Sequence, residues 1–512
     1  MENVFASVQN GSDVRGVAIA TDQENVTLTE GMAFFIAVAF REHLVRKTGK
    51  ALADLRIGIG HDSRVTAEAF ARAAACGLAG SRIFSCGLVS TPSMFRSTLL
   101  PESDFDGAIM LTASHLPFNR NGMKFFTKDG GMEKNEVKEI LLRAAVLAEG
   151  TAKDANGFPC MPEDANDTSE AFDLITLYAK SLQEYMIEAV DAEDRAHPLA
   201  GLHVVVDAGN GASGFFASRI LEPLGADISG SAFLEPDGTF PNHVPNPENE
   251  TAMEAVRDAT MKAGADLGVI FDCDGDRAAV VFADGTEVNR NTLIALLSSI
   301  VAEEAPGSVI VTDSITSDEL TEFLTGHLGL EHLRFKRGYK NVIDKGIELN
   351  AAGKRCELAI ETSGHAAFRQ NDFSDDGAYI CVRILIRMAQ LRREGRRIEE
   401  LIADLKEPGD AREVRFAIAG EDFADYATGV LEDLRSLAEQ DARFHIVEPN
   451  YEGIRIAFND EEVKGWVLLR KSLHDPVMPM NVEAVEKGGV DIIFDRLEPF
   501  LREHDRLTRK ES

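Results

Sequence analysis

Short apolar runs alternate with longer helix-like stretches along most of the chain, and this alternation restricts the possible folds most strongly. The runs Leu55–Gly60, Ala108–Leu111 and Leu267–Phe271 have the composition of buried strands. Stretches such as Glu30–Arg46, Thr66–Leu78 and Phe172–Val190 are predicted helices, and Gly11–Gly16 is a predicted turn-rich segment. Strands that alternate with helices indicate βαβ units around a parallel or mixed sheet. We therefore expect an α/β protein.

The alternation is interrupted at two points that are candidate domain boundaries. Residues Ala148 to Ser169 are rich in Gly, Asp, Asn, Glu and Pro and are predicted to form a linker or a surface excursion. After Pro408 and Gly409, short alternating strands appear among helices, which is typical of an α+β domain. A chain of 512 residues also exceeds what one core supports. We expect three α/β domains and one C-terminal α+β domain, with boundaries at 1–165, 166–288, 289–408 and 409–512.

The composition indicates the class of protein and the cellular compartment. The 44% hydrophobic and 27% charged residues are those of a soluble globular protein. The sequence has no apolar run near the ~20 residues that cross a bilayer, and its start lacks the basic and apolar regions of a signal peptide. The six cysteines are scattered without a CxxC pair, which favours reduced, mostly buried thiols. Together these features predict a cytoplasmic protein.

The formal net charge of −32 restricts the partners. Nucleic acids and anionic membrane surfaces need clustered Lys and Arg, so we expect neither as a partner. An anionic small substrate stays possible, because a few arginines can reverse the field inside a cleft. The sequence leaves the choice between a monomer and a homodimer open.

A serine follows the strand Ala108–Leu111, in the run Thr112-Ala113-Ser114-His115-Leu116-Pro117. Pro117 and the Asn-Arg-Asn-Gly cluster after it predict a loop, with Lys124 on the same loop. The serine would then lie at the mouth of a sheet, with a histidine beside it. An ordinary turn is the alternative, because hydroxyls also serve as turn and cap residues.

Three carboxylates follow another apolar strand, at Asp272, Asp274 and Asp276. Oxygen ligands of this kind suit a hard divalent cation, most plausibly Mg²⁺. An acidic surface turn is the alternative. An EF-hand fits poorly, because Gly275 is at loop position four and Ala283 stands where the bidentate Glu belongs. A metal held by three carboxylates can polarise a transferring phosphoryl group.

The run Gly209–Gly214 matches the dinucleotide fingerprint G-x-G-x-x-G between a strand and a predicted helix, Gly214–Leu224. The acidic residue expected at the end of the next strand is not clearly placed, because that apolar stretch is short and broken by Gly230. We favour a tight strand-to-helix turn. A nucleotide-dependent oxidoreductase is the competing interpretation.

Two more loops bring polar groups together. Glu361-Thr362-Ser363-Gly364-His365 follows a strand and combines a carboxylate, hydroxyls and an imidazole, which suits binding of sugar hydroxyls. Arg470-Lys471-Ser472 follows another strand and suits phosphate binding by a bidentate arginine, a hydroxyl and backbone donors. Capped or solvated turns are the alternatives for both loops.

Taken together and in this order, the four loops resemble those of the α-D-phosphohexomutase family. Thr112–Pro117 resembles its phosphoserine loop, Asp272–Arg277 its metal loop, Glu361–His365 its sugar loop, and the Arg470 segment its phosphate loop. The similarity extends over nearly the whole chain. It implies four domains around one cleft, with one loop from each, and a phosphoryl group carried on Ser114.

The resemblance also implies a set of site residues. The catalytic residues would be Ser114, Lys124, Arg15 and His115. The ligands of one Mg²⁺ would be Ser114, Asp272, Asp274 and Asp276. The substrate would bind to Arg277, Lys336, Glu361, Ser363, His365, Arg470, Ser472 and His474. Among these we prefer Lys124 over Arg15 for proton transfer, because an arginine can hardly lose its proton.

The implied reaction interconverts hexose 1-phosphate and hexose 6-phosphate through a hexose 1,6-bisphosphate. Thr362 in the sugar loop favours a glucose or mannose phosphate, with glucosamine phosphate as an alternative. His474 and Asp475 replace the usual Thr and Glu of the phosphate loop. That departure supports a second alternative, a catalytically silent relative that binds sugar phosphates. A serine hydrolase is disfavoured because no G-x-S-x-G surrounds Ser114.

Overall fold

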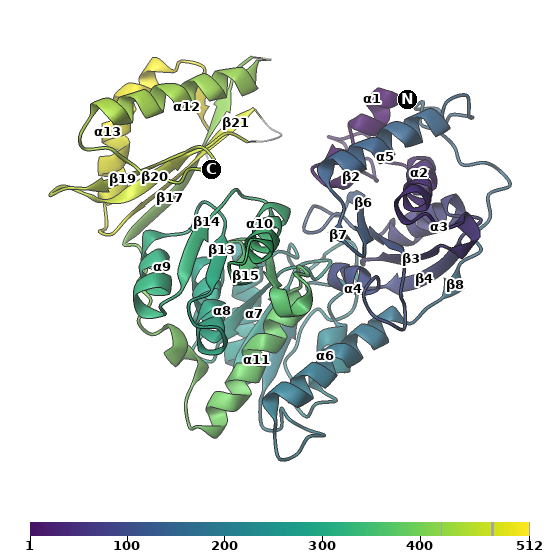
Figure 1. Ribbon diagram of the computed structural model, residues 1–512, viewed down its shortest axis with the longest axis horizontal. Helices are drawn as coiled ribbons and strands as arrows, with labels where there is room; N and C mark the ends of the chain where they lie inside the picture. Colours follow the sequence, from purple (N-terminus) through teal and green to yellow (C-terminus); the bar gives the residue numbers. More distant parts are fainter. Residues whose placement is uncertain (421, 473–475, 511–512) are drawn as a thin grey trace. The chain divides into compact units, whose positions relative to one another are not determined.

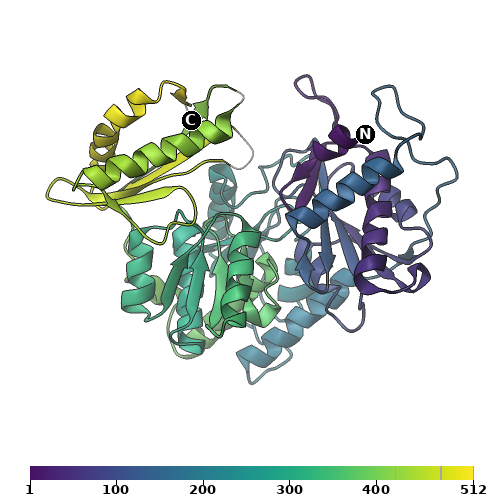
Figure 2. The same ribbon diagram turned by 45° about the horizontal axis from the view of Figure 1, so that its top comes forward.

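The computed structural model describes residues 1–420, 422–472 and 476–510. The chain divides into two compact units. The first unit contains Met1–Leu293 and Ser363–Glu399, and the second contains Ile294–Thr362 and Glu400–Ser512. Among the described residues, no helix has both the length and the apolar character that a membrane crossing requires. Figures 1 and 2 show the elements of both units in two views that differ by a 45° turn.

The first unit begins with a mixed sheet whose strand order is β1-β2-β6-β5-β3-β4-β8, with β7 on β6. Its strands are β1 (Gln9–Asn10), β2 (Asp13–Val17), β3 (Arg56–His61), β4 (Arg82–Leu88), β5 (Gly107–Leu111), β6 (Arg120–Thr127), β7 (Gly130–Gly131) and β8 (Glu170–Ala171). Strands β5, β3, β4 and β8 run parallel, whereas β6 is antiparallel to both β5 and β2. The sheet is therefore mixed.

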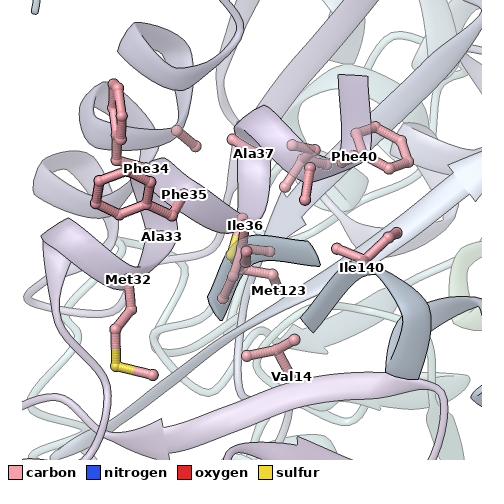
Figure 3. Close-up of a cluster of buried hydrophobic side chains, with 14 of the residues drawn as sticks. Val14, Met32, Ala33, Phe34, Phe35, Ile36, Ala37, Phe40, Met123 and Ile140 are labelled. Carbon is pink, nitrogen blue, oxygen red and sulfur yellow. The ribbon is translucent and has the colours of Figure 1, made fainter. Parts of the chain in front are cut away.

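One face of this sheet is covered by four helices and contains the largest core of the unit. They are α1 (Glu2–Ala6), α2 (Glu30–Thr48), α3 (Ala67–Gly77) and α5 (Lys134–Leu147). In Figure 3, Ile36 of α2 lies beside Met123 in this core. Helix α2 begins where Thr29 accepts a hydrogen bond from the Met32 N–H and ends at Gly49, which has φ +71°.

The other face packs against α4 (Thr91–Arg96) and the start of α6 (Leu174–Val190). Its core includes Phe84 and Phe105, whose stacked rings have centroids 5.0 Å apart. The central strand β5 is apolar throughout because both faces of the sheet are buried. The residues that follow β5 lie at the end of the sheet where its parallel strands terminate.

A second sheet of the first unit has the strand order β12-β11-β10-β9. Its strands are β9 (Val204–Asp207), β10 (Leu267–Phe271), β11 (Ala278–Phe282) and β12 (Glu287–Val288). Strands β9 and β10 are parallel, and β11 is antiparallel to β10. Helix α7 (Glu250–Ala263) packs on this sheet through Met253 and Val256. A π-helical turn, Phe216–Leu221, forms where a longer helix, Gly214–Leu224, was predicted.

The first unit ends with β16 (Ala366–Phe368) and α11 (Gly377–Arg393). Helix α11 packs on α6, where the rings of Tyr185 and Tyr379 stack at 5.4 Å. The Tyr178 hydroxyl donates a 2.6 Å hydrogen bond to Asp376, which caps α11.

The second unit contains a parallel sheet in which β13 lies between β14 and β15. These strands are β13 (Val309–Thr312), β14 (Glu331–Arg334) and β15 (Cys356–Ile360). The associated helices are α8 (Arg290–Glu304), α9 (Asp318–Glu322), which continues as a π-helical turn, and α10 (Tyr339–Ala351). The loops after the three strands leave the sheet at the same edge.

The C-terminal part of the second unit is an antiparallel sheet with the order β18-β19-β20-β21-β17-β22. Its strands are β17 (Asp410–Ile418), β18 (His445–Ile446), β19 (Ile454–Asn459), β20 (Lys464–Leu469), β21 (Val477–Ala484) and β22 (Leu507–Arg509). Helices α12 (Phe423–Gln440) and α13 (Gly489–Glu503) bury their apolar faces against it. Figure 1 shows both helices on the same face of the sheet. The predicted α+β character of this region is confirmed.

Two local predictions are wrong. Arg15 lies on strand β2, although Gly11–Gly16 was expected to be a turn. Lys124 lies on strand β6, opposite Met110 of β5, although it was expected on the serine loop. Turn-type residues form strands here because the pairing of β6 with β2 and with β5 outweighs their local preference. The first sheet also extends to Ala171 of β8, beyond the predicted boundary at residue 165. The four domain boundaries stay a prediction.

Candidate active site

Ser114 lies just beyond the end of β5, in an uncommon backbone conformation. Its φ of +51° is in the left-handed region, which few residues other than glycine adopt. The Ser114 N–H donates a 2.8 Å hydrogen bond to the Thr112 hydroxyl. This turn directs the Ser114 side chain away from the strand, into a buried polar site.

The guanidinium of Arg64 holds the serine loop in place through hydrogen bonds. It donates hydrogen bonds to the backbone carbonyls of Ser114, Leu116, Pro117 and Arg120. Arg64 is buried and pairs with the equally buried Asp62, its Nε lying 3.3 Å from the carboxylate. This pair was not predicted as functional, although its residues form an Asp-x-Arg run directly after a predicted strand.

The three aspartates follow β10 in a tight loop and converge. Carboxylate oxygens of Asp272, Asp274 and Asp276 lie within 4.8 Å of one another, and all three residues are buried. Gly275 has φ +74°, and a Cβ there would lie 2.5 Å from the Ser213 hydroxyl oxygen. The loop therefore requires glycine at this position.

Positive charge offsets part of this acidic cluster. The ammonium of Lys124 pairs with Asp276 and lies 3.1 Å from Asp274, and the Thr91 hydroxyl donates to Asp274 at 2.6 Å. Burial alone would raise the pKa of Asp274, but Lys124 outweighs it and the pKa is lowered. Burial and the charges of Asp276 and Asp274 raise the pKa of Asp272 well above its usual range.

The donor set fits a hard divalent cation. The Oδ1 atoms of Asp274 and Asp276 are buried, and neither accepts a hydrogen bond from the described residues. Buried carboxylate oxygens without donors are costly unless a cation binds them. Three clustered carboxylates with such oxygens match the ligands that Mg²⁺ prefers.

The serine and the aspartate cluster meet directly. The Ser114 hydroxyl lies 3.1 Å from Asp272 Oδ2 and 3.3 Å from Nδ1 of His115. Burial and the positive charges of Arg277 and Arg15 lower the pKa of His115 to about 3. His115 is therefore a neutral imidazole beside Ser114.

Arg277 is almost wholly buried beside the same cluster. Its Nε lies 3.1 Å from Asp272 Oδ2, and its Nη1 lies 3.3 Å from Asn246 Oδ1 and 3.6 Å from Glu248. Its Nη2 is buried without a hydrogen-bond partner among the described residues. Arg277 therefore positions Asp272 and keeps one unsatisfied donor.

His365 forms an ion pair next to the cluster. Its Nδ1 lies 2.6 Å from Asp375 and 3.8 Å from Asp276. Burial alone would lower the pKa of His365, but these two carboxylates outweigh it and raise the pKa to about 9. A cationic imidazole cannot ligate a metal but can donate a proton. Asp375 was not predicted from the sequence, where it is one acidic residue among many.

Arg15 contributes to the charge around the serine from β2. Its Nη2 lies 2.9 Å from Asp13, and its charge lowers the pKa of His115. The first unit thus brings Ser114, His115 and Lys124 together with the aspartates. Ser363, also predicted for substrate, is buried, and its hydroxyl has no hydrogen-bond partner among the described residues.

The second unit carries the remaining predicted residues that the structure describes. Glu361 follows β15, and its Oε1 accepts a 2.6 Å hydrogen bond from the Gly338 N–H. The Thr362 hydroxyl donates to the buried Asp313 at 2.7 Å, so this side chain points into the unit. Thr362 therefore ties the loop down, although its identity had been used to favour particular sugars.

Arg470 follows β20, and its Nη1 lies 3.5 Å from Glu452. The Ser472 N–H donates to Val477 at 2.9 Å, and His474 and Asp475 lie outside the described residues. Lys336 is exposed, with its ammonium 5.9 Å from the ring centre of Phe335.

Two charged residues of this unit, Arg337 and Glu452, were not predicted as part of the site. Arg337 lies 3.6 Å from Asp313, and Glu452 contacts both Arg337 and Arg470. No motif in the sequence distinguished either residue. The sequence feature that could have indicated Glu452 was its position directly before Gly453 and strand β19.

The glycine-rich run Gly209–Gly214 is explained by packing. A Cβ at Gly211 would lie 2.5 Å from the Cys273 carbonyl oxygen, and one at Gly214 would lie 2.2 Å from the Leu234 carbonyl oxygen. The turn lies against the metal loop, so glycine is needed for close approach. Cys273 itself is a buried thiol whose pKa burial raises far above its usual range.

Family models agree with this organisation. Three descriptions match the chain: phosphoglucomutase/phosphomannomutase alpha/beta/alpha domain I over residues 7–149, domain II over 176–285 and domain III over 289–408. Each match covers one of the predicted α/β regions. The metal loop falls in domain II and the serine loop in domain I.

Relatives cover nearly the whole chain. A phosphoglucosamine mutase of Kineococcus radiotolerans is 29% identical over 96% of this chain and 98% of its own. A phosphomannomutase/phosphoglucomutase of Pseudomonas aeruginosa is 27% identical, with 94% and 92% covered. A phosphoglucomutase of Neisseria gonorrhoeae is 24% identical, with 99% of each covered.

The fold is also that of a solved relative. The crystal structure of a phosphoglucomutase/phosphomannomutase family protein from Burkholderia thailandensis matches with a TM-score of 0.76 and 25% identity, covering 99% of this chain and 98% of the other. The three matched domains, the full-length relatives and the shared fold agree with the resemblance of the four loops. The chain belongs to the α-D-phosphohexomutase family of isomerases.

Proposed function

We propose that this chain interconverts hexose 1-phosphate and hexose 6-phosphate, with glucose or mannose phosphate as substrate, through a phosphoserine at Ser114. One observation carries the proposal: the Ser114 hydroxyl lies 3.1 Å from Asp272, in a buried cluster of three aspartates that also binds Lys124. A serine placed against clustered carboxylates suits a phosphoryl group whose charge would be neutralised by a cation bound to those carboxylates.

The phosphoryl group would pass between Ser114 and the sugar. The bond from Ser114 Oγ to phosphorus breaks as a bond from a sugar hydroxyl oxygen to the same phosphorus forms. The sugar hydroxyl loses its proton, and the Ser114 oxygen is left to accept one. The reverse transfer, from the other end of the hexose 1,6-bisphosphate, restores phosphoserine and releases the product.

Cationic groups around Ser114 support both directions. Lys124, Arg277 and His365 supply fixed positive charge near the transferring oxygens. Lys124 and His365 are also the groups that can exchange protons with the sugar hydroxyl and the Ser114 oxygen. His115 is neutral and positions the serine. Asp272, Asp274, Asp276 and Ser114 would hold one Mg²⁺, which would neutralise charge on the phosphoryl oxygens.

The second unit would bind the rest of the sugar phosphate. Arg470 and Ser472 suit the phosphate that does not react, and Glu361 suits sugar hydroxyls. The assembly of all four loops around one cleft stays a prediction. Binding at both ends of the substrate explains how a bisphosphate could be retained while it turns over.

Turnover on a panel of sugar phosphates tests this function. The purified chain with Mg²⁺ should convert glucose 1-phosphate or mannose 1-phosphate to the 6-phosphate, and a trace of hexose 1,6-bisphosphate should raise the rate. Glucosamine 1-phosphate belongs in the panel, because a relative at 29% identity is named a phosphoglucosamine mutase. Turnover of none of these sugars would reject the proposal and leave the silent sugar-phosphate-binding relative.

A further inference from the structure

Glu452 joins three segments of the second unit through one carboxylate. Its Oε2 accepts hydrogen bonds from the Ser314 hydroxyl at 2.9 Å and from the Arg337 N–H at 2.8 Å. Its Oε1 lies 3.5 Å from Nη1 of Arg470. Ser314 follows β13, Arg337 follows β14 and Arg470 follows β20, so loops from both sheets of the unit meet at this side chain.

The turn that carries Glu452 is held on both sides. The ring of Tyr451 packs on Phe335, with the centroids 4.7 Å apart. Gly453 has φ +61°, and a Cβ there would lie 2.1 Å from the Leu469 carbonyl oxygen and 2.8 Å from Cα of Arg470. The backbone of Gly453 is thus packed against the start of the phosphate loop, which fixes the direction of the Glu452 side chain.

The same contacts connect the phosphate loop with the sugar loop. Arg337 donates its N–H to Glu452, and the next residue, Gly338, donates its N–H to Glu361. The N–H groups of two successive residues therefore connect Glu452, which pairs with Arg470, to Glu361. A shift of Glu452 would move both ends of this connection.

Of the carboxylates that raise the pKa of Arg470, which are Glu452, Glu413 and Asp313, Glu452 has the largest effect. The Arg470 side chain is 12% exposed, and burial lowers the pKa of its guanidinium while Glu452 opposes that shift. A mostly buried guanidinium needs a counter-ion and a fixed orientation if it is to bind a phosphate in bidentate geometry.

We propose that Glu452 is a positioning residue for substrate recognition. It holds the guanidinium of Arg470 and the Arg337–Gly338 segment in one geometry, so that a phosphate and a sugar ring are recognised at a fixed spacing. This inference rests on the proposed function. The phosphate concerned does not react, so its loss would weaken ground state and transition state equally.

The test separates charge from shape. Glu452→Gln keeps an oxygen for Ser314 and Arg337 but removes the charge that faces Arg470. We expect KM for the hexose 1-phosphate to rise about tenfold with kcat nearly unchanged. Glu452→Asp keeps the charge but is one methylene shorter and cannot reach all three partners, so KM should rise in that variant too.

Glu448→Gln is the matched control. Glu448 lies in the same turn region, pairs with Arg435 at the surface, and should leave KM at the wild-type value. Wild-type KM in both Glu452 variants would overturn the inference. A large loss of kcat with unchanged KM would also overturn it, because positioning of a non-reacting phosphate cannot produce that pattern.

A binding measurement distinguishes this inference from the proposed function. Calorimetry with inorganic phosphate and glucose 6-phosphate needs no turnover. Wild type and Glu448→Gln should bind both ligands, and Glu452→Gln should bind them about tenfold more weakly. If wild type binds but does not turn over any sugar phosphate, the proposed function fails and the role of Glu452 stands. If wild type binds neither ligand, or if Glu452→Gln binds as tightly, the role of Glu452 is rejected.

Discussion

At the residue scale, the position of Ser114 depends on one arginine. The Arg64 guanidinium donates hydrogen bonds to four backbone carbonyls of the serine loop, and Asp62 balances its charge. Side-chain donors that satisfy several carbonyls at once hold a loop in a single conformation. The left-handed conformation of Ser114 is retained because these contacts over-determine it.

Arg64→Lys should therefore misplace the serine while keeping the charge. We expect kcat to fall on the order of 10²-fold, because small displacements of a reacting group have effects of that size. Steady-state kinetics and a thermal unfolding curve measure the effect and check folding. Arg56→Lys in the same sheet is the control, since Arg56 donates to the single carbonyl of Ser103. Equal kcat values in the two variants would contradict the role of Arg64.

Residues whose own side chains suit the chemistry were easier to predict from the sequence than residues that only position other side chains. Ser114 and the three aspartates stand in short runs whose chemistry is legible without a structure. Asp375 and Glu452 lie in no recognisable run, and their importance comes from contacts with residues 10 and 18 positions away in the chain. Such pairings depend on tertiary structure, which a single sequence does not reveal.

At the element scale, strands and helices with strong periodicity were predicted well. Strand β10 has the predicted bounds, and α2 and α6 differ from prediction by two residues at one end. Failures occurred where turn-type residues pair in a sheet, as in β2 and β6. There the hydrogen-bonding partners, distant in sequence, decide the conformation.

The glycine-rich turn after β9 gives a prediction at this scale. Gly211→Ala should push a Cβ into the backbone of Cys273, which lies between Asp272 and Asp274 in the chain. We expect a loss of about 1–3 kcal/mol in stability and weaker Mg²⁺ binding, because overpacking must displace the loop. Thermal unfolding with and without Mg²⁺ measures both.

Gly429→Ala in helix α12 is the matched control, since no atom lies within 4 Å of a Cβ there. This substitution should leave stability equal or slightly higher, because alanine favours helix. If Gly211→Ala behaves in the same way, the packing explanation of the turn is wrong. A shift of the unfolding midpoint on addition of NAD would support a nucleotide site instead.

Strand β21 carries a group that should make the second unit sensitive to pH. Burial raises the pKa of Glu483 to about 7, although the charge of Arg455 opposes this. The folded form therefore binds a proton that the unfolded chain has lost above about pH 4.5. This contribution to stability is complete below that pH and is lost as the pH rises through about 7.

Glu483→Gln should remove that dependence. The amide has no charge to bury, so the variant should gain thermal stability over wild type at pH 8 and gain little at pH 4.5. Unfolding midpoints at several pH values measure the difference. An equal difference between the two proteins at all pH values would show that Glu483 does not titrate in this range.

At the scale of the whole molecule, the metal should affect the two units differently. All three aspartates lie in the first unit, so a cation that binds the folded cluster stabilises that unit by mass action. Chelation with EDTA should abolish activity and lower the unfolding midpoint of the first unit. The unfolding of the second unit should be unchanged, and Mg²⁺ should restore both properties.

This metal prediction is checked by calorimetry, in which two units can unfold as separate transitions. Asp276→Asn is the matching variant, because it removes one charge from the cluster without changing its size. It should lose the response to Mg²⁺. An activity that survives both EDTA and this substitution would contradict a metal-assisted mechanism.

The overall architecture was predictable because the alternation of strands and helices extends through most of the chain. The division into two compact units was not, since Ser363–Glu399 joins the first unit although it follows β15 of the second in the chain. Which segments pack together depends on long-range contacts. Composition and periodicity alone do not determine them.

The central claim is that Ser114 accepts and donates a phosphoryl group, and mass spectrometry tests it most directly. Wild-type protein incubated with Mg²⁺ and a hexose 1,6-bisphosphate should gain the mass of one phosphoryl group, located by peptide mapping on Ser114. The Ser114→Ala variant should gain none and should lack mutase activity. A phosphoryl group found on another residue, or equal labelling and activity of Ser114→Ala, would contradict the account.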